Sequence, residues 1–153
     1  MYRLELKIPP AALVLLFALV MWIVSKMASW AIVQIPGKEW VAFALWMAGA
    51  VMIGAGIVAF ISAKTTANPL MPELSTSLVT KGVYGLTRNP MYAGFLLVLA
   101  GWAAFLENIF PALLLPLFVL YMNRFQIIPE EKVLLSKFGE AYARYLKSVR
   151  RWM

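Results

Sequence analysis

Four long apolar stretches, separated by short polar segments, dominate the chain. They cover about residues 11–33, 40–61, 91–106 and 110–128, and the second contains 22 residues without a charge. An α-helix rises about 1.5 Å per residue, so about 20 apolar residues cross the ~30 Å hydrocarbon core of a bilayer. The pattern predicts an all-α integral membrane protein with four transmembrane helices in a single domain, residues 1–153.

The pattern of apolar and polar positions changes after Pro129. From there apolar side chains recur at helical spacing, and lysines and arginines lie largely between them. This is typical of a basic amphipathic helix lying on a membrane surface. We therefore predict a C-terminal interfacial helix over about residues 130–150, with Gly139 as a candidate break.

The composition supports a membrane protein. Of the 153 residues 63% are hydrophobic and 14% charged, whereas soluble domains are about half apolar and about a quarter charged. The chain has no cysteine and no histidine, which excludes disulfides, a thiolate nucleophile and the commonest metal ligand and general base. We expect no metal site. The net charge of +7 fits a basic membrane-facing surface better than nucleic-acid binding.

The basic residues are concentrated in alternate polar segments. With the N-terminus inside, twelve of the fourteen lysines and arginines fall on the inner side, and only Lys26 and Lys38 lie near the outer side. The positive-inside rule therefore predicts that both termini are cytoplasmic, in the inner or plasma membrane of a bacterium or archaeon. All seven acidic residues are glutamates outside the predicted spans, and the adjacent pair Glu130-Glu131 falls on the cytoplasmic face.

Residues 87–94, with the sequence Thr-Arg-Asn-Pro-Met-Tyr-Ala-Gly, mark the entry of the chain into the third span. One interpretation is a helix start, with Asn89 as N-cap, Pro90 at the first helical position, and Arg88 and Tyr92 at the interface. The other is a binding site, in which Arg88 and the free amides of the helix start attract an anionic group. The residue types alone leave both open.

The other candidate residues also have two interpretations each. Glu130 and Glu131 either complement the dipole of a helix start or bind a cationic or hydroxyl-bearing ligand. Gly54 and Gly56 either allow close helix packing or make room for a flat ligand ring. Tyr145 is either an interfacial anchor or a ligand contact.

From about Gly54 to Trp152 the chain resembles the membrane methyltransferases related to isoprenylcysteine carboxyl methyltransferase and phospholipid N-methyltransferase. The resemblance rests on six blocks: Thr65-Thr66-Ala67-Asn68-Pro69, Leu78-Val79-Thr80-Lys81-Gly82-Val83-Tyr84, Arg88-Asn89-Pro90-Met91-Tyr92-Ala93-Gly94, Glu130-Glu131, Phe138-Gly139-Glu140-Ala141-Tyr142 with Tyr145, and Arg150-Arg151-Trp152.

The resemblance implies a site for S-adenosylmethionine on the cytoplasmic side and a lipophilic acceptor that enters from the bilayer. It implies catalytic roles for Arg88, Glu130 and Glu131. The residues implied to bind the cofactor are Gly54, Gly56, Arg88, Asn89, Pro90, Tyr92, Glu130, Glu131 and Tyr145. The prenylcysteine enzymes typically have histidine at the position of Asn89, so the resemblance implies methyl transfer to a different small hydrophobic or lipid acceptor, through a carboxylate, amine or thiol.

Two other functions are compatible with the pattern. The first is an NADPH-dependent enzyme similar to the sterol reductases, although the chain has few basic residues to spare for a 2′-phosphate. The second is a small membrane transporter or adaptor, although a proton-coupled carrier needs an acidic residue within a span. No glutamate lies inside a predicted span; Lys26 is the only charged residue well inside one, and Arg124 lies near the cytoplasmic end of the fourth.

Overall fold

The computed structural model describes residues 5–66, 68 and 70–152. Two residues of the first sequence block, Ala67 and Pro69, lie outside this range. The described chain forms helices and no strand, which confirms the all-α prediction. In order, the elements are α1 (Pro10–Met27), α2 (Lys38–Ser62), the 3₁₀ turns η1 (Pro72–Leu74) and η2 (Gly82–Gly85), α3 (Pro90–Leu106), α4 (Ile109–Tyr121), the π-helical stretch η3 (Met122–Ile127) and α5 (Ile128–Ser148).

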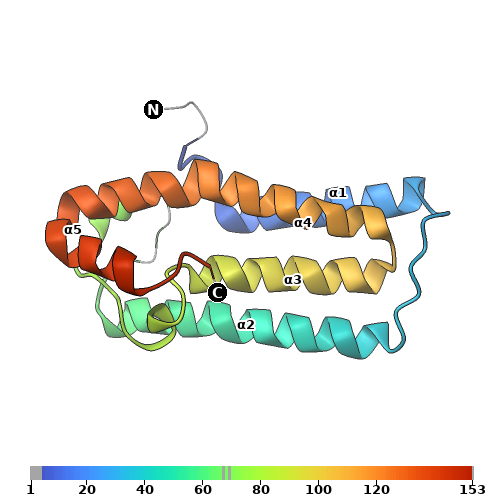
Figure 1. The fold of residues 1–153 in the computed structure, drawn as a ribbon, viewed down its shortest axis with the longest axis horizontal. Coiled ribbons are helices and arrows are strands. Elements are labelled where there is room, and N and C mark those ends of the chain that lie inside the picture. The colour runs from blue at the N-terminus through green and yellow to red at the C-terminus, as the bar shows by residue number, and fades with distance from the viewer. Residues whose placement is uncertain (1–4, 67, 69, 153) are drawn as a thin grey trace.

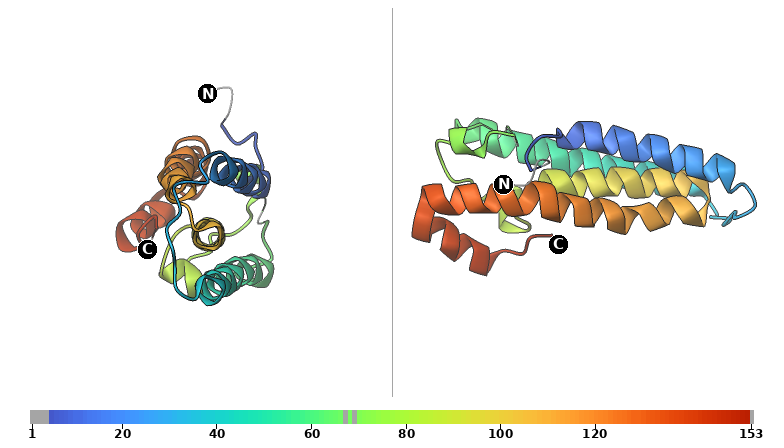
Figure 2. Two further views of the ribbon diagram at one scale, coloured as in Figure 1. Left: turned by 90° about the vertical axis from the view of Figure 1, so that its right-hand side faces the viewer. Right: turned by 90° about the horizontal axis from the view of Figure 1, so that it is seen from above.

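The helices form an elongated bundle with α3 at its centre. Figure 1 shows α2 and α3 side by side, and the end-on view in Figure 2 places α3 between α2 and the pair formed by α1 and α4. The buried core joins α1, α3 and α4. It consists of Leu13, Met21, Tyr92, Leu99, Ala103, Phe118, Met122 and Ile127. Most other large apolar side chains face outward, as expected for helices surrounded by lipid.

Three helical segments are long and apolar enough to cross a membrane: α1, α2 and the run over Ile109–Ser148, which has a kink at Gly139. The central helix α3 has 17 residues, at the lower limit of a span. The structure thus supports an integral membrane protein, and the count of four spans stays a prediction. The helical run over Ile109–Ser148 is broken at Gly139. The part before the break is about 45 Å long, longer than the ~30 Å hydrocarbon core, so only its apolar portion, which ends near Ile128, is suited to lie in the membrane.

The first helix is shorter than the predicted span over residues 11–33, because α1 ends at Met27. The side-chain amide of Asn108 donates a 2.7 Å hydrogen bond to the carbonyl of Ala28, just beyond the helix end. The chain that follows then pairs with the turn between α3 and α4, through hydrogen bonds from Val33 N to Glu107 O and from Ile109 N to Ala31 O. These contacts replace the helical hydrogen bonds of the expected last turns.

Close contact between α2 and α3 depends on glycine. A Cβ atom on Gly94 would lie 2.7 Å from the carbonyl oxygen of Gly49, and a Cβ on Gly49 would lie 2.7 Å from the carbonyl oxygen of Gly94. Real Cβ atoms do not approach backbone oxygens this closely. The two backbones are therefore in direct contact, as small residues permit in membrane helix pairs.

The predicted fourth span and the predicted interfacial helix form one helix across Pro129. Proline cannot donate a hydrogen bond to the carbonyl four residues earlier, which belongs to Phe125. The backbone N–H of Leu6 donates to that carbonyl instead, at 3.1 Å, and the helix continues from α4 into α5. The break comes at Gly139, which has φ 52° and ψ −127°, a conformation suited to glycine. From there the chain folds back toward the start of α3 (Figure 1).

Candidate functional site

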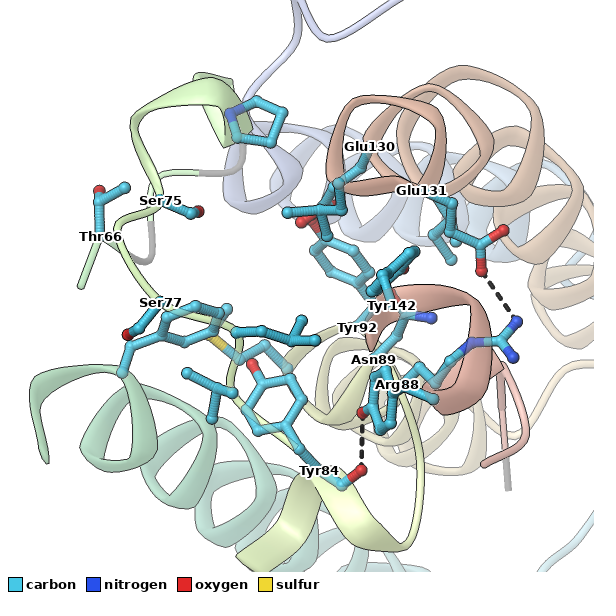
Figure 3. Close-up of a pocket in the computed structure, with 18 of the residues that line it drawn as sticks. Thr66, Ser75, Ser77, Tyr84, Arg88, Asn89, Tyr92, Glu130, Glu131 and Tyr142 are labelled. Carbon is cyan, nitrogen blue, oxygen red and sulfur yellow. Dashed lines mark hydrogen bonds and ion pairs between the residues drawn. The ribbon is translucent and has the colours of Figure 1, made fainter. Parts of the chain in front are cut away.

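A cavity opens at the end of the bundle where α5 folds back. It has a volume of about 720 Å³, including its mouth to solvent. Figure 3 shows its polar side chains converging from separate parts of the chain. The lining comes from the α2–α3 connection, from the start of α3 and from η3 with α5. The labelled side chains are Thr66, Ser75, Ser77, Tyr84, Arg88, Asn89, Tyr92, Glu130, Glu131 and Tyr142.

Arg88 lines the cavity and binds the C-terminal part of the chain. Its Nη1 donates to the carbonyls of Leu146 and Val149, both at 2.8 Å. Its Nη2 lies 2.9 Å from Oε1 of Glu131. The Nε is buried and has no hydrogen-bond partner within the described residues. Most of the donors of Arg88 thus hold the protein itself together, and one buried N–H is left unsatisfied.

The residues on either side of Arg88 bind the C-terminal segment (residues 149–152) as well. The hydroxyl of Thr87 and the side-chain amide of Asn89 both donate to the carbonyl of Arg151, at 3.1 and 2.9 Å. The backbone N–H of Arg88 donates to the carbonyl of Arg150. Asn89 does occupy the N-cap position of α3, but its side chain makes no capping hydrogen bond. The expected capping role is therefore replaced by a long-range contact.

Glu131 lies between two arginines. Its Oε1 accepts from Arg88 Nη2 and from Arg151 Nε, and its Oε2 accepts from Arg151 Nη2 at 2.6 Å. The two contacts with Arg151 have the parallel geometry of a strong arginine–carboxylate pair. Side-chain exposure is 11% for Arg88 and 15% for Glu131, so solvent screens this cluster only weakly. Both oxygens of Glu131 are already used inside the protein.

Glu130 has a different environment from its neighbour. The hydroxyl of Tyr92 donates to its Oε2 at 2.9 Å, and Gln126 donates to the Tyr92 hydroxyl at 3.4 Å. No ion pair within the described residues involves Glu130. Burial, with repulsion from Glu131, raises the pKa of its carboxyl to about 7. Glu130 is thus a partly buried carboxyl group at the cavity wall, without a cation to balance its charge.

Three hydroxyl-bearing residues of the α2–α3 connection line the side of the cavity opposite Glu130 (Figure 3): Thr66, Ser75 and Ser77. The connection is fixed by hydrogen bonds from Ser77 Oγ to the carbonyl of Ala63, at 3.0 Å, and from the ammonium of Lys137 in α5 to the carbonyl of Glu73. The hydroxyl-bearing wall is therefore attached to both α2 and α5.

Tyrosine side chains complete the cavity wall. The hydroxyl of Tyr145 donates a 2.6 Å hydrogen bond to the carbonyl of Tyr84 in η2, and the ring of Tyr84 packs edge-on against Phe60 of α2. Tyr145 thus connects α5 to the α2–α3 connection and lines the cavity. Its position does not match that of an interfacial anchor, because it is 7% exposed.

Three of the predicted cofactor-binding residues do not line the cavity: Gly54, Gly56 and Pro90. A Cβ atom on Gly56 would lie 2.6 Å from Met91 Cγ and 3.6 Å from Pro90 Cγ, so this glycine allows α2 to pack against the start of α3. A Cβ on Gly54 would meet nothing within 4 Å. The structure brings the other six predicted residues together around the cavity: Arg88, Asn89, Tyr92, Glu130, Glu131 and Tyr145.

Two features of the site have little or no signal in the sequence. Arg151 lies within one of the matching blocks, but nothing local indicates its pairing with Glu131. Ser75 and Ser77 belong to no block, and their only sequence signal is a cluster of hydroxyl residues in a loop. The contact of each with the site depends on long-range folding.

Comparisons with known proteins agree with the resemblance seen in the sequence. The model of the phospholipid methyltransferase family matches residues 38–141, a little over two thirds of the chain. This segment runs from α2 into α5 and includes Arg88, Glu130 and Glu131. It ends before Tyr145 and the C-terminal segment.

Two relatives match parts of the chain. An uncharacterized protein of Haemophilus influenzae is 46% identical over 63 residues, which are 41% of this chain and all of that protein. The protein-S-isoprenylcysteine O-methyltransferase of Schizosaccharomyces pombe is 38% identical over 72 residues, 47% of this chain. The match spans 30% of the length of the fission yeast enzyme. No solved structure matches the chain.

The family model covers the central helices and the polar start of α3, where the cavity lies. The chain therefore belongs to the phospholipid methyltransferase family.

Proposed function

We propose that this protein transfers a methyl group from S-adenosylmethionine to a small hydrophobic or lipid acceptor. One observation carries the proposal. A cavity at the end of helices suited to a membrane has Glu130, which has no balancing cation, on one side and the hydroxyl-bearing residues Thr66, Ser75 and Ser77 on the other. The family of the chain supports methyl transfer, and the name of the fission yeast relative supports a lipophilic acceptor.

The chemistry of the cavity fits this cofactor. S-adenosylmethionine carries an ammonium, a carboxylate, a sulfonium and a ribose diol. The cavity offers a carboxyl group on Glu130 and hydroxyl-bearing side chains on Ser75 and Ser77, and Arg88 forms part of its wall.

The two adjacent glutamates have different roles in this proposal. Glu130 binds the ammonium or the diol of the cofactor, since its carboxyl group lacks a protein cation. Glu131 acts through Arg88, because its oxygens are already occupied by the guanidinium groups of Arg88 and Arg151. Tyr92 orients Glu130 through its hydroxyl. Asn89 and Tyr145 contribute by fixing the C-terminal segment and η2 around the cavity.

The reaction places few chemical demands on the protein. When bound, the cofactor supplies an electrophilic methyl group on its sulfonium. In-line transfer of that group requires proximity, alignment and exclusion of water more than acid–base groups. In this proposal the fixed side chains of the cavity wall align the reactants, and Tyr84 is part of that wall. A carboxylate or thiolate acceptor needs no general base, which is consistent with a chain that lacks histidine.

Binding of the cofactor is the first test. Calorimetry of the purified protein in detergent should detect S-adenosylmethionine and its demethylated product. Glu130→Gln should weaken binding about 10- to 100-fold, because a charged hydrogen bond contributes about 1.5–3 kcal/mol. Lys132→Gln, two residues along α5, is the control and should bind as the unmodified protein does. Absence of binding at millimolar cofactor in a helical, monodisperse sample would refute the proposal.

The acceptor can be found by methyl transfer to membrane lipids. Radiolabelled S-adenosylmethionine should label a component of a lipid extract in the presence of the protein, and the label should disappear with Glu130→Gln. The stability of the product to mild base then separates a methyl ester from an N- or S-methyl product. If NADPH, and not S-adenosylmethionine, stabilises the protein against heat, the sterol-reductase hypothesis is favoured instead.

We further propose that the cavity faces the cytoplasm. The described parts near both termini lie at the cavity end of the bundle, where most basic residues are found. Because the chain has no cysteine, single cysteines can be introduced without background. In intact cells an impermeant maleimide should label Gln34→Cys, at the opposite end, and should label Lys147→Cys only after permeabilisation. The reverse pattern would overturn the orientation.

A further inference from the structure

A second groove lies at the opposite end of the bundle from the cavity. It is formed by the end of α1, the end of α3 and the segments that follow them, and its volume, including its opening to solvent, is about 760 Å³. One basic side chain, Lys26, lines it together with Trp22 of α1, with Ser29 just beyond the end of α1, and with Trp102 and Leu106 of α3. The groove shares no residue with the candidate methyl-transfer site.

Lys26 has no partner in the part of the chain that the structure describes. No ion pair or hydrogen bond of its ammonium group is found there. The nearby acid Glu107 is engaged elsewhere, because Lys38 donates a 2.7 Å hydrogen bond to its Oε2 and the backbone N–H of Ile35 donates to its Oε1. A lysine in the last turn of a membrane helix is thus left without a counter-charge.

The rest of the groove is amphipathic. The ring of Trp102 stacks on that of Phe105, with centroids 5.7 Å apart, and its indole N–H is already donated to the carbonyl of Ala18. Trp102 therefore offers only apolar surface, which Leu106 extends. Ser29, in the turn just after α1, also lines the groove, and its hydroxyl makes no hydrogen bond within the described residues. One end of the groove suits an anionic oxygen group and the other suits a hydrocarbon chain.

We propose that this groove binds an anionic glycerophospholipid from the leaflet opposite to the methyl-transfer cavity. The lipid phosphate pairs with the ammonium of Lys26 and accepts from the hydroxyl of Ser29, and an acyl chain lies against Trp22, Trp102 and Leu106. A lipid with a net negative charge is favoured over a zwitterionic one. The ammonium of a zwitterionic headgroup would lie near Lys26, and the carboxylate that could receive it, Glu107, is already paired with Lys38.

The proposal is tested with delipidated protein in a nonionic detergent. Phosphatidylglycerol should raise the melting temperature in a saturable manner, whereas phosphatidylcholine and inorganic phosphate should not. Lys26→Gln should weaken the apparent affinity for phosphatidylglycerol about 10- to 100-fold, as expected for loss of a charged hydrogen bond. Lys7→Gln, at the other end of the bundle, is the matched control and should retain the response. Lys26→Arg should also retain it.

A spectroscopic measurement locates the bound lipid. Brominated phosphatidylglycerol should quench the fluorescence of Trp22 and Trp102, and Lys26→Gln should reduce this quenching at the same lipid concentration. Lys26 is exposed, so its replacement leaves the packing of the bundle unchanged. An equal response of Lys26→Gln and the unmodified protein would overturn the proposal. Equal stabilisation by phosphatidylcholine, or by inorganic phosphate alone, would also overturn it.

Discussion

Replacing Arg88 with alanine should loosen the C-terminal segment more than it disturbs the bundle. The side chain is 11% exposed and makes charged hydrogen bonds to two backbone carbonyls near the C-terminus and to Glu131. A hydrogen bond from a charged donor contributes about 1.5–3 kcal/mol. The segment keeps its contacts with Thr87 and Asn89, and Glu131 keeps its pair with Arg151. The net cost should therefore be about 2–4 kcal/mol.

Hydrogen exchange measures this effect locally. If the segment opens independently, a cost of about 2–4 kcal/mol corresponds to about 30- to 700-fold faster exchange in peptides that cover residues 141–152. The backbone N–H of Val149, which donates to the carbonyl of Tyr145, reports on the opening directly. Peptides from α2 and the centre of α3 should exchange as before. Arg88→Lys keeps the charge but cannot reach both carbonyls in the same way, so it should show an intermediate effect.

Cofactor binding separates the two roles of Arg88. If Arg88 acts by holding the C-terminal segment in place, Arg151→Ala should also speed hydrogen exchange in residues 141–152, since Arg151 belongs to the same cluster around Glu131. The reasoning is wrong if Arg88→Ala abolishes binding of S-adenosylmethionine while exchange of residues 141–152 stays unchanged. Arg88 would then act only as a ligand contact.

Three further predictions concern packing, ionisation and a hydrogen bond. Gly94→Ala should lower the free energy of unfolding in detergent by about 1–3 kcal/mol, because its Cβ would lie 2.7 Å from a carbonyl oxygen of α2. A Cβ on Gly54 would meet nothing within 4 Å, so Gly54→Ala should not lower the free energy of unfolding in this way. Equal losses of stability in the two variants would contradict the close contact between α2 and α3. The pKa of the Glu130 carboxyl is about 7 in the folded protein, against an ordinary value of 4.5, so the folded protein binds the carboxyl proton more tightly than the unfolded chain does. The stabilisation from this protonated carboxyl is therefore fully present below pH 4.5 and is lost as pH rises through about 7. The melting temperature of the unmodified protein should fall over this range for that reason, and thermal melts of Glu130→Gln from about pH 5 to 8 should lack that decrease. Tyr145→Phe should cost about 0.5–1.5 kcal/mol in the same assay, through loss of its 2.6 Å hydrogen bond to η2; no loss would show that the hydrogen bond is not formed in solution.

Local patterns predicted the helices well, because a membrane span is a local property of the sequence. About 20 consecutive apolar residues are sufficient to define it, and the observed α2 and α3 differ from the predicted spans by no more than two residues at each end. Where the observed helix ends differ from the predicted span ends, the difference depends on residues that are distant in the chain. The first helix ends early because Asn108 binds the carbonyl of Ala28. The helix continues through Pro129 because Leu6 satisfies the carbonyl of Phe125.

The membership of the site was partly predictable, but the roles within it were not. Sequence blocks identified Arg88 and the two glutamates as candidates, because their chemistry and order are visible in the chain. They could not show that Glu131 is shared by two arginines, whereas Glu130 contacts Tyr92 and Gln126 at the cavity wall. Adjacent residues on a helix point in different directions, about 100° apart, so neighbours in sequence acquire different partners.

The sequence by itself determined that this is a basic, all-α membrane protein with a polar cluster at the entry to α3, and it revealed the family. Composition, apolar length and short motifs carry that information without reference to distant residues. Only the tertiary structure decided that the C-terminal segment is bound by Thr87, Arg88 and Asn89, and that Lys26 lies in a groove without a counter-charge. The reason is physical: a hydrogen bond or an ion pair depends on a separation of about 3 Å in space, and the partners here are up to about 60 residues apart in the chain.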